Sequence, residues 1–530
     1  MRVIVVGAGF AGAIAARIAR AQGHDVTLVE RGSHPRFALG ESSTPLAAIV
    51  LERLAVRYGL ADLHQLASYG QWRAHLPALR CGLKRGFTFY RHERGEPFRG
   101  DADNRNRLLV AASPDDVAAD THWMREDVDD FLVRRAQDEG VHYLDETDLA
   151  TIEAAGDELS LTATRIGRTL NLAADFVIDA SGAAGTVAKC LGVTSERLAG
   201  GLRTGLVYGH FEGVKPLTST LPHDATVPEG PFPDERAAVH HLIDEGWMYE
   251  LRFDTGVVSA GFVLELGRGG NAESRLAPAL ADRDPSDTFH QLLRQYPTLA
   301  DEFEQARPTR PIATVPVLQR RLTRAAGHRW VALPHTYMFW SPLFSTGIAW
   351  SLLGVERVGL MLEQERVKDQ LPTALQRYEA TLRAEGDHLR RLIEVAYSCR
   401  SDFDGFDLIA QVYFVAASYC ETVQRCCSPP DGLDGGWAWF GFLGATDPVL
   451  RGIVRAAPQL IQDDSASSRL EAIRRHVAAR NVAGLADPMR RRLYPVDSAT
   501  VVAAAHVLGL SRDEVRSRLP QLRSGPATIE

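Results

Sequence analysis

Residues 1–45 read MRVIVVGAGFAGAIAARIARAQGHDVTLVERGSHPRFALGESSTP, and this stretch decides the fold. It opens with the apolar run Val3-Ile4-Val5-Val6, which is typical of a buried parallel strand. A glycine-rich turn at residues 7–12 follows, then a segment with helical spacing, then a second apolar strand that ends at Glu30. This order of strand, turn, helix, strand and acid predicts a dinucleotide-binding βαβ unit.

The turn Gly7-Ala8-Gly9-Phe10-Ala11-Gly12 carries three glycines with separate roles in such a unit. The first permits the tight turn, the second lets a pyrophosphate approach the backbone, and the third lets the helix pack on the strand. The pyrophosphate lies at the positive helix N-terminus, and the acid accepts a hydrogen bond from a ribose hydroxyl. The alternative is a glycine turn in an unrelated α/β domain. The first interpretation predicts these cofactor contacts: Gly7, Gly9, Phe10, Ala11, Gly12, Glu30 and Arg31.

The size and composition are those of an ordinary globular enzyme. A chain of 530 residues is too long for one simple core, so two or three structural units are expected. Hydrophobic residues make up 45% and charged residues 24%, and the net charge is −8. Because no broad positive field is present, we expect neither nucleic acid nor anionic lipid as a partner.

Cysteine usage and hydropathy point to a cytoplasmic protein. The six cysteines form no disulfide framework, and no pair has metal-ligand spacing, so no metal is expected. No stretch reaches about 18 uninterrupted apolar residues, which excludes a membrane-spanning segment. The first apolar run is already the nucleotide strand, so it does not indicate a leader peptide.

The turn Gly40-Glu41-Ser42-Ser43-Thr44-Pro45 resembles one found in group-2 flavoprotein oxidoreductases and flavin-dependent halogenases. Those families carry G-E-S/A-x-x-P at this distance from the first glycines, on the path toward the flavin ring. The alternative is a polar loop with a helix cap at Thr44 before Pro45, and both interpretations are compatible. The resemblance implies FAD as the cofactor, with contacts from Gly40, Glu41, Ser42 and Ser43.

A lysine lies at the start of the next informative stretch, residues 81–90, whose later half alternates like a strand. A lone lysine is ordinarily a solvated surface group. Flavin-dependent halogenases, however, carry their essential lysine one strand after the G-E-S turn and its helix. The resemblance therefore implies that Lys84 is catalytic, and Arg85 is the alternative one residue away.

Two further segments resemble cofactor-contacting motifs of the same flavoproteins. Residues 123–131 resemble the arginine-bearing segment that leads into a helix beside FAD, although acids in the first turn also suit an ordinary amphipathic helix. Residues 175–182 resemble the second nucleotide-contact motif. The resemblance implies that Arg125 and Asp179 contact the cofactor.

Between about residues 200 and 330 the pattern changes to antiparallel strands, which suit a substrate domain over the flavin. Halogenases usually show W-x-W-x-I-P at the first of these strands. Here Trp247 is retained, whereas Tyr249, Leu251 and Arg252 replace the other three residues. That motif is thought to keep bulky substrates off the flavin, so its decay leaves room for monooxygenation.

The stretch from His328 to Ile348 corresponds to G-D-A-A-G-F-x-D-P-L-x-S-x-G-I of these flavoproteins. Its second half is retained, but His335 and Ser341 replace the two aspartates. The retained half predicts a helix N-terminus, which favours an anion. The resemblance implies FAD contacts at Pro342, Gly347 and Ile348, and a halide at Thr346 and Gly347. Phe344 stands where tryptophan halogenases have glutamate, which points away from free tryptophan as the substrate.

We therefore expect an α/β protein: a Rossmann-like FAD-binding domain with an inserted antiparallel-sheet substrate domain and a helical C-terminal extension. The expected bounds are 1–200 and 326–400 for the FAD-binding parts, 201–325 for the substrate domain and 401–530 for the extension. The arginine triplet at residues 490–492 suits a solvated helix face, or an acidic carrier protein as partner.

The resemblance implies a flavin-dependent halogenase of the phenolic or carrier-bound type. A separate flavin reductase supplies reduced FAD, and oxygen with chloride or bromide yields hypohalous acid, which Lys84 directs onto an electron-rich aromatic ring such as a phenol or pyrrole. The ammonium suits this role because it stabilises the departing hydroxide. Two alternatives stay open: an FAD-dependent monooxygenase or dehydrogenase on the same fold, and a non-catalytic relative with little flavin. The sequence leaves the substrate, the halide and carrier presentation undetermined.

Overall fold

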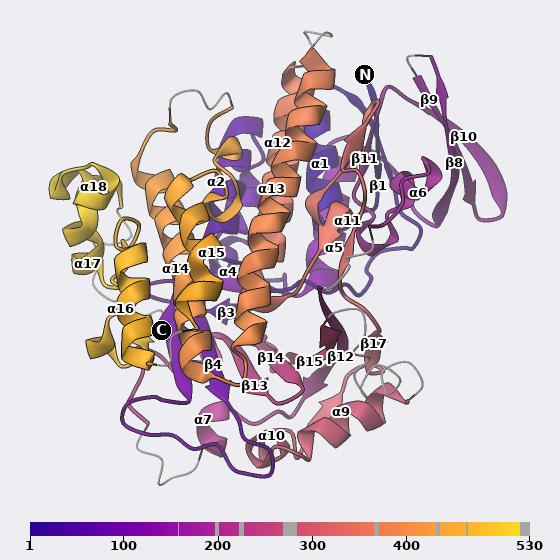
Figure 1. The fold of residues 1–530 in the computed structure, drawn as a ribbon. Coiled ribbons are helices and arrows are strands. Elements are labelled where there is room, and N and C mark those ends of the chain that lie inside the picture. The colour runs from indigo at the N-terminus through magenta and orange to yellow at the C-terminus, as the bar shows by residue number, and fades with distance from the viewer. Residues whose placement is uncertain are drawn as a thin grey trace.

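The computed structural model describes residues 1–156, 158–196, 201–221, 227–268, 283–364, 370–430, 435–462 and 465–519. The fold combines a parallel-sheet unit, a large and mostly antiparallel sheet, and a layer of long helices that contacts both (Figure 1). This arrangement agrees with the predicted α/β class.

The parallel-sheet unit is built around the opening strand. Its strand order is β19-β20-β11-β1-β2-β7, and all pairs are parallel except β19 with β20. Helix α1 follows β1 and packs against both α5 and α12. The bounds are β1 Arg2–Val6, β2 Asp25–Val29, β7 His142–Leu144, β11 Phe176–Asp179, β19 Ala326–Gly327, β20 Trp330–Ala332, α1 Phe10–Ala21, α5 Arg125–Asp138 and α12 Gly347–Gln364.

A three-stranded antiparallel sheet projects from this unit between β7 and β11, at the upper right of Figure 1. Short helices complete the unit. Their bounds, with those of the three strands, are β8 Thr147–Ala155, β9 Glu158–Arg165, β10 Arg168–Ala174, α2 Pro45–Tyr58, α3 Ala61–Gln65, α4 Tyr69–His75, α6 Thr186–Cys190 and α11 Pro334–Tyr337.

The large sheet differs from the predicted substrate domain at residues 201–325. Its strand order is β16-β12-β15-β14-β13-β4-β5-β22, with β17 beside β12, so strands from residues 86–111 and 493–494 belong to it as well. The alternating residues of β4 explain this, because Phe87 and Phe89 face the helical layer while Tyr90 packs on the opposite face. The bounds are β4 Gly86–Arg91, β5 Arg107–Ala111, β12 Leu202–Glu212, β13 Ala238–Ile243, β14 Gly246–Arg252, β15 Val258–Arg268, β16 Arg307–Pro308, β17 Ala313–Val315 and β22 Leu493–Tyr494.

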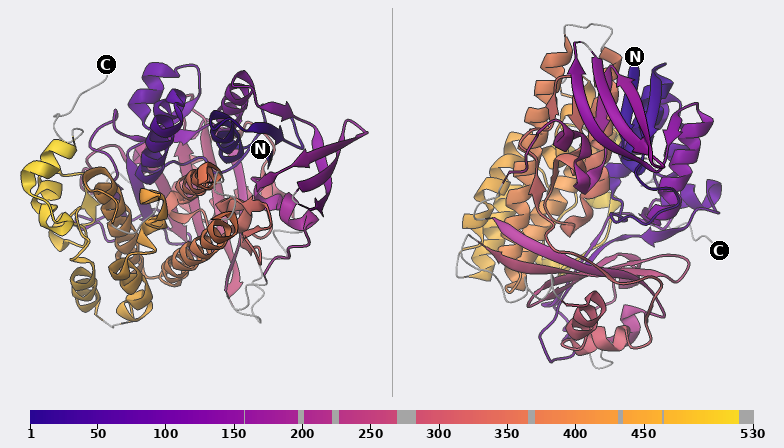
Figure 2. Two further views of the ribbon diagram at one scale, coloured as in Figure 1. Left: turned by 90° about the horizontal axis from the view of Figure 1, so that it is seen from above. Right: turned by 90° about the vertical axis from the view of Figure 1, so that its right-hand side faces the viewer.

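Two short strand pairs connect the sheets. Strand β3 pairs antiparallel with β6, and β18 pairs antiparallel with β21. Figure 2 (right) shows the large sheet beneath the parallel-sheet unit, with α9 and α10 on its far face. The bounds are β3 Cys81–Lys84, β6 Asp120–Trp123, β18 Arg320–Arg321, β21 Met338–Phe339, α7 Leu217–Thr220, α9 Pro285–Leu293 and α10 Pro297–Glu302.

The helical layer begins with α12 and continues through the predicted extension, of which residues 520–530 lie outside the described residues. Helix α14 packs against α2, α13, α15, α16 and α18, so it lies at the centre of the layer. Among the described helices, none combines the length and the apolar character that crossing a bilayer requires. The bounds are α13 Leu371–Ser398, α14 Phe403–Cys426, α15 Pro448–Leu460, α16 Ala466–Val477, α17 Ser498–Ala503 and α18 Arg512–Arg518.

Candidate active site

The glycine turn is so tight that two of its positions accept only glycine. Gly7 has a φ of +103°, and a Cβ built there would lie 2.5 Å from the carbonyl oxygen of Ala180. A Cβ on Gly12 would lie 1.9 Å from the carbonyl oxygen of Gly7. Real Cβ atoms do not approach backbone so closely, so any side chain here displaces β1, α1 or β11. These are the roles predicted for the two residues.

Gly9 lies beneath two guanidinium groups. A Cβ built on Gly9 would lie 3.5 Å from Nη2 of Arg125, 3.7 Å from Oδ2 of Asp129 and 3.9 Å from Nη2 of Arg36. Phe10 and Ala11 begin α1 at the same place, and a helix N-terminus carries partial positive charge. Two cations and a helix N-terminus around an uncovered backbone fit the pyrophosphate of FAD.

Glu30 is buried at the end of β2 and holds the turn as well as facing the site. Its Oε2 accepts hydrogen bonds from the N–H of Ala8 at 2.9 Å and from Nη2 of Arg36 at 3.0 Å. Burial raises the pKa of Glu30, but Arg36 and the backbone donors outweigh it and leave the pKa below its ordinary value. Arg31, the predicted contact, is exposed, and Arg36 takes the place beside Glu30.

Arg125 joins the two loops that border the cofactor region. Its Nη1 donates to the carbonyl oxygens of Leu39 at 2.6 Å and Gly40 at 3.1 Å. The other side of its guanidinium pairs with Asp129, and Oδ1 of Asp129 accepts from the N–H of Phe10 at 3.0 Å. The sequence analysis missed Asp129, although its i,i+4 spacing from Arg125 on α5 was a signal for an ion pair.

Asp179 is buried but turns toward its own neighbours. Its Oδ1 accepts from the hydroxyl of Ser181 at 2.6 Å, and its Oδ2 accepts from the N–H of Ala188 on α6 at 3.1 Å. Burial raises the pKa of Asp179 despite these bonds. The observed contacts make it an anchor for the loop after β11, and its contact with the cofactor stays a prediction.

The turn at residues 40–45 contacts three separate parts of the molecule. The buried carboxylate of Glu41 bonds to Nε2 of His210 at 2.8 Å and to the hydroxyl of Ser259 at 2.6 Å, both on the large sheet. The hydroxyl of Ser345 donates to that of Ser42 at 3.1 Å. The turn therefore brings the nucleotide unit, the large sheet and the loop before α12 together.

Lys84 lies at the end of β3, fully buried. Its Nζ donates to the carbonyl oxygen of Ser43 at 2.6 Å and lies 4.0 Å from the centre of the Phe87 ring. Asp120 is opposite it in the β3–β6 register and is also buried. Burial lowers the pKa of Lys84 to about 7, against the opposing effect of Asp120. Burial raises the pKa of Asp120, against the opposing effect of Lys84, so the charge of each group affects the pKa of the other.

Arg85, the alternative to Lys84, lies between β3 and β4 and makes different contacts. Its guanidinium pairs with Asp116 at 2.6 Å, donates to the carbonyl oxygen of Pro114 and lies over the Phe232 ring. These contacts turn Arg85 away from the 40–45 turn. Of the two neighbours, Lys84 alone contacts that turn.

The loop before α12 has an unusual backbone. Phe344 and Ser345 have φ values of +67° and +54°, which side-chain-bearing residues rarely adopt. The hydroxyl of Tyr413 on α14 donates to the carbonyl oxygen of Phe344 at 2.9 Å, and the two rings stack at 4.4 Å. Thr346 and Ile348 are buried, and Pro342 is half-buried. The strained loop places Ser345 against Ser42, just before the first turn of α12.

His335 lies against Gly347, where the related flavoproteins have aspartate in place of the histidine. A Cβ built on Gly347 would lie 2.5 Å from Cε1 of His335. Burial lowers the pKa of His335 to about 3, helped by Arg320 and Arg125, so its imidazole is neutral. The first turn of α12 therefore meets an uncharged ring.

Trp247, the retained residue of the altered tryptophan motif, is buried and fixed in place. Its Nε1 donates to the hydroxyl of Tyr397 at 2.7 Å, and that hydroxyl lies 3.1 Å from the hydroxyl of Ser341. Ser341, which replaces an aspartate, thus connects the loop before α12 to the large sheet. The tryptophan also packs on His240, with ring centres 5.3 Å apart.

A cavity of about 140 Å³ lies next to Thr44, Pro45 and Phe87. An engineered apolar cavity of similar size holds a benzene ring. One end is formed by Thr44, Pro45 and the Phe87 ring, which directly adjoin Ser43 and Lys84. The remaining walls come from β5, one face of α14 and residues 482–519. No single motif predicts this cavity, because its walls are distant in sequence.

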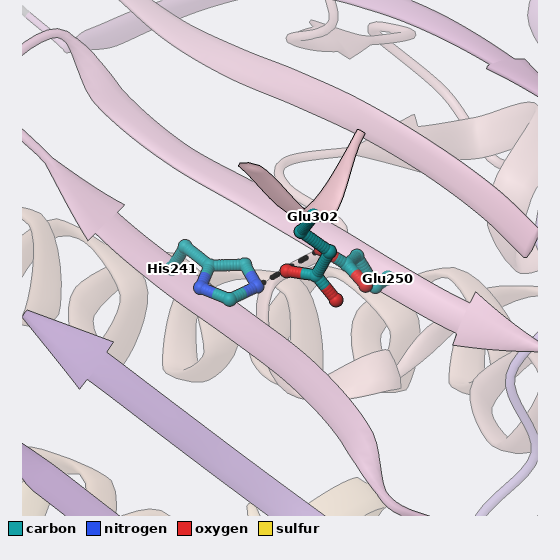
Figure 3. Close-up of side chains that lie close together, drawn as sticks. All are labelled: His241, Glu250 and Glu302. Carbon is teal, nitrogen blue, oxygen red and sulfur yellow. Dashed lines mark hydrogen bonds and ion pairs between the residues drawn. The ribbon is translucent and has the colours of Figure 1, made fainter. Parts of the chain in front are cut away.

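A second group of ionisable side chains lies outside the FAD region, on the face of the large sheet that packs against α9 and α10 (Figure 3). His241, Glu250 and Glu302 are fully buried, with donor atoms within 4.8 Å of one another. Arg252 donates to Glu302 at 2.9 Å and lies 3.4 Å from Glu250. Burial and the charge of Glu250 raise the pKa of Glu302 well above its ordinary value. The guanidinium of Arg252 therefore balances part of the charge of the two carboxyls.

The fold and this geometry define an FAD-binding oxidoreductase. The family model for FAD dependent oxidoreductases matches residues 2–335, which is more than half of the chain, and the protein belongs to this family. The predicted FAD cofactor is confirmed at this level, and so is the prediction that the protein is an enzyme.

Within this class, the chain is similar to flavin-dependent halogenases. It is 24% identical to the monodechloroaminopyrrolnitrin halogenase PrnC of Pseudomonas fluorescens, over 78% of this chain and 70% of that one. It is 26% identical to the tetracycline 7-halogenase of Kitasatospora aureofaciens, over 66% of this chain and 60% of that one. The fold matches the crystal structure of halogenase PltM in complex with phloroglucinol and FAD, with a TM-score of 0.81 at 21% identity, over 93% of this chain and 99% of that chain. The predicted resemblance is confirmed.

Proposed function

We propose that this protein is a flavin-dependent halogenase that transfers chloride or bromide, as an electrophile, to an electron-rich aromatic ring. The observation that carries the proposal is the position of Lys84. Its buried Nζ bonds to the carbonyl oxygen of Ser43 in the 40–45 turn and lies 4.0 Å from the centre of the Phe87 ring, which forms part of the wall of a ring-sized cavity. A cation close to both the flavin-side turn and the wall of a substrate cavity suits an oxidant-directing lysine.

The cofactor end of the proposal rests on the glycine turn. Gly7, Gly9, Gly12, Glu30 and Arg125 would hold the nucleotide part of FAD, since they provide an uncovered backbone, an acceptor for ribose and a cation for the pyrophosphate. Reduced FAD supplies the electrons with which oxygen is activated for halide oxidation. A separate flavin reductase is the proposed source of that reduced FAD.

The halide would lie at the first turn of α12. Thr346 and Gly347 begin this 18-residue helix, whose N-terminus favours an anion. The hydrogen bond from Ser345 to Ser42 holds this turn against the 40–45 turn.

The ammonium of Lys84 would act on the hypohalous acid. A protonated Nζ donates a hydrogen bond to the oxidant's oxygen and stabilises hydroxide as it leaves. Complete burial excludes water, which strengthens this interaction and protects the oxidant from hydrolytic side reactions. The aromatic lining of Phe87, Tyr413 and Phe414 suits a flat ring as the acceptor.

One observation favours a second candidate, an FAD-dependent monooxygenase. The imidazole of His335 crowds Gly347, and it replaces a residue that halogenase-like flavoproteins keep as aspartate. If this ring fills the anion position, oxygen rather than halogen would be transferred. Dependence on halide therefore separates the two candidates.

The experiment supplies FAD, NADH and a flavin reductase to the purified protein, with a panel of phenols and pyrroles, in buffers with and without bromide or chloride. We expect a halogenated product by mass spectrometry only with halide. Lys84→Met should lower the yield by about 10²-fold or more, the cost of removing one donor to a developing anion. The matched control is Arg85→Met, which removes the neighbouring cation, between β3 and β4, that pairs with Asp116 instead, and it should keep the yield. Equal oxygenated product in halide-free buffer would show that the protein is a monooxygenase.

A further inference from the structure

One face of α14 forms a wall of the cavity that changes character along its length. Residues at helical spacing line it, with rings and alanine at one end and polar side chains at the other. In chain order they are Tyr413, Phe414, Ala417, Ser418, Glu421, Thr422 and Arg425. The cavity thus has an aromatic end near Phe87 and a polar end near Glu421.

Most polar groups on the walls are already bonded to the protein. The hydroxyl of Thr422 donates to the carbonyl oxygen of Ser418 at 2.8 Å. The hydroxyl of Ser418 donates to the carbonyl oxygen of Val415 at 3.3 Å. Asp497 caps α17 through the N–H of Ala499 and the hydroxyl of Thr500. These groups have little capacity left for a ligand.

Glu421 differs because only one of its oxygens is engaged. Oε1 accepts from Nε of Arg425 at 3.1 Å, whereas Oε2 has no hydrogen-bond partner among the described residues. Arg425 is held in turn by Glu52 on α2, at 3.0 Å. The Glu421 side chain keeps 25% of its surface exposed and lines the cavity. It therefore offers a fixed carboxylate oxygen to whatever enters.

The carboxylate of Glu421 also influences the charged pair at Lys84 electrostatically. The charge of Glu421 acts on Asp120, raising its pKa, and Asp120 in turn is coupled to Lys84. Burial raises the pKa of Glu421 itself, against the effect of Arg425, so it is a stronger base than a solvated glutamate. An aromatic substrate ring between Phe87 and Glu421 would have the carboxylate acceptor of Glu421 on one side and Phe87, with Lys84 next to it, on the other.

We infer that Glu421 recognises the substrate by accepting a hydrogen bond from a ring hydroxyl on Oε2, which makes hydroxylated aromatic rings the substrate class. This inference rests on the proposed function and deepens it. The carboxylate touches the substrate and also activates it, because a ring whose hydroxyl is losing its proton is richer in electrons.

The atoms and charges of this step balance when the hypohalous acid of the proposed reaction is the oxidant. The hydroxyl proton moves to Oε2 of Glu421 as a ring carbon bonds to the halogen and the halogen–oxygen bond breaks. The hydroxide released takes the proton from that carbon to form water. Glu421 then returns its proton to the product oxygen, so the ring exchanges one hydrogen for one halogen.

The test measures binding by calorimetry on the FAD-loaded protein without halide or reductant, using resorcinol and its dimethyl ether, 1,3-dimethoxybenzene. We expect wild type to bind resorcinol at least tenfold more tightly than the ether, because the ether lacks the donor. Glu421→Ala should weaken resorcinol binding about tenfold or more, and Glu421→Gln should keep most of the binding because its amide oxygen still accepts. The matched control is Glu52→Gln, which removes the other partner of Arg425 outside the cavity and should bind resorcinol like wild type.

A second arm separates this inference from the proposed function. In turnover with bromide, Glu421→Gln should lower kcat for resorcinol more than it changes KM, because it accepts a hydrogen bond but no proton. Resorcinol binding that depends on Glu421, without any halogenation, would overturn the proposed function and keep the recognition site. Equal binding of resorcinol and its ether, or wild-type binding by Glu421→Ala, would overturn the inference.

Discussion

Nζ of Lys84 donates a 2.6 Å hydrogen bond to the carbonyl oxygen of Ser43. This bond joins the end of β3 to the turn that also meets the nucleotide unit, the large sheet and the loop before α12. Nζ carries further N–H donors beyond this bond. The charge of Asp120 raises the pKa of Lys84, although the two side chains form no close ion pair. The environment of Lys84 is therefore tuned by a residue that the sequence motif does not contain.

Replacing Asp120 should change how product formation depends on pH. Because burial lowers the pKa of Lys84 to about 7, its ammonium is present below that pH and lost as pH rises. The charge of Asp120 raises the pKa of Lys84, so Asp120→Asn should move this falling limb to lower pH. The measurement is kcat/KM for halogenation against pH with saturating reduced FAD. Asp116→Asn, which removes the partner of Arg85, should leave the limb in place, and a shift toward higher pH in Asp120→Asn would contradict the assignment.

Gly9 and Gly12 should respond differently to substitution. A Cβ on Gly9 makes only ordinary contacts, the nearest at 3.5 Å, so Gly9→Val should fold. Its side chain would project toward Arg125 and Arg36 and fill the space proposed for the pyrophosphate, so FAD should no longer be retained. Gly12→Ala should instead lower the melting temperature, since its Cβ would lie 1.9 Å from a backbone oxygen. Absorbance at flavin wavelengths and thermal unfolding check both, and FAD retention by folded Gly9→Val would refute the nucleotide site.

A substitution at Gly347 tests the anion position. A Cβ would meet His335 at 2.5 Å, so Gly347→Ala must displace that imidazole and narrow the first turn of α12. We expect halogenation to fall at least tenfold while FAD is retained. The double variant with His335→Ala removes the clash with the ring. If the double variant recovers full activity, crowding by His335 caused the loss, and the backbone at Gly347 needs no open space for a halide.

The buried cluster at His241 makes a prediction about stability. Burial and the charge of Glu250 raise the pKa of Glu302 well above its ordinary value, which favours the neutral carboxyl, and Glu302→Gln mimics that form. We expect a change below about 1 kcal/mol in the free energy of unfolding. Glu250→Gln removes the charge that Arg252 balances, and should cost about 3 kcal/mol, as breaking a buried pair does. Urea unfolding at pH 7 compares them, and an equal cost for both would show that Glu302 is ionised.

Most of the predictions from the sequence rest on local motifs. The glycine turn, Glu30, the 40–45 turn and the helix at residue 347 are set by nearest neighbours in the chain, so one sequence suffices to locate them. Arg36 and Asp129 escaped notice because their roles depend on which loops fold over the turn. The extent of the large sheet escaped for the same reason, since β4 pairs with β13 across about 150 residues of sequence.

The cavity beside Lys84 is completed by the last parts of the chain to be made. Residues 1–348 contain the nucleotide turn, Lys84 and the start of α12, whereas α14 and residues 482–519 supply the remaining walls. During synthesis, and after any proteolytic loss of the C-terminal segment, the cofactor-binding portion could exist without an enclosed space for the oxidant. Without those walls, the hypohalous acid of the proposed reaction would not be enclosed by the chain, so containment of the oxidant depends on the C-terminal segment.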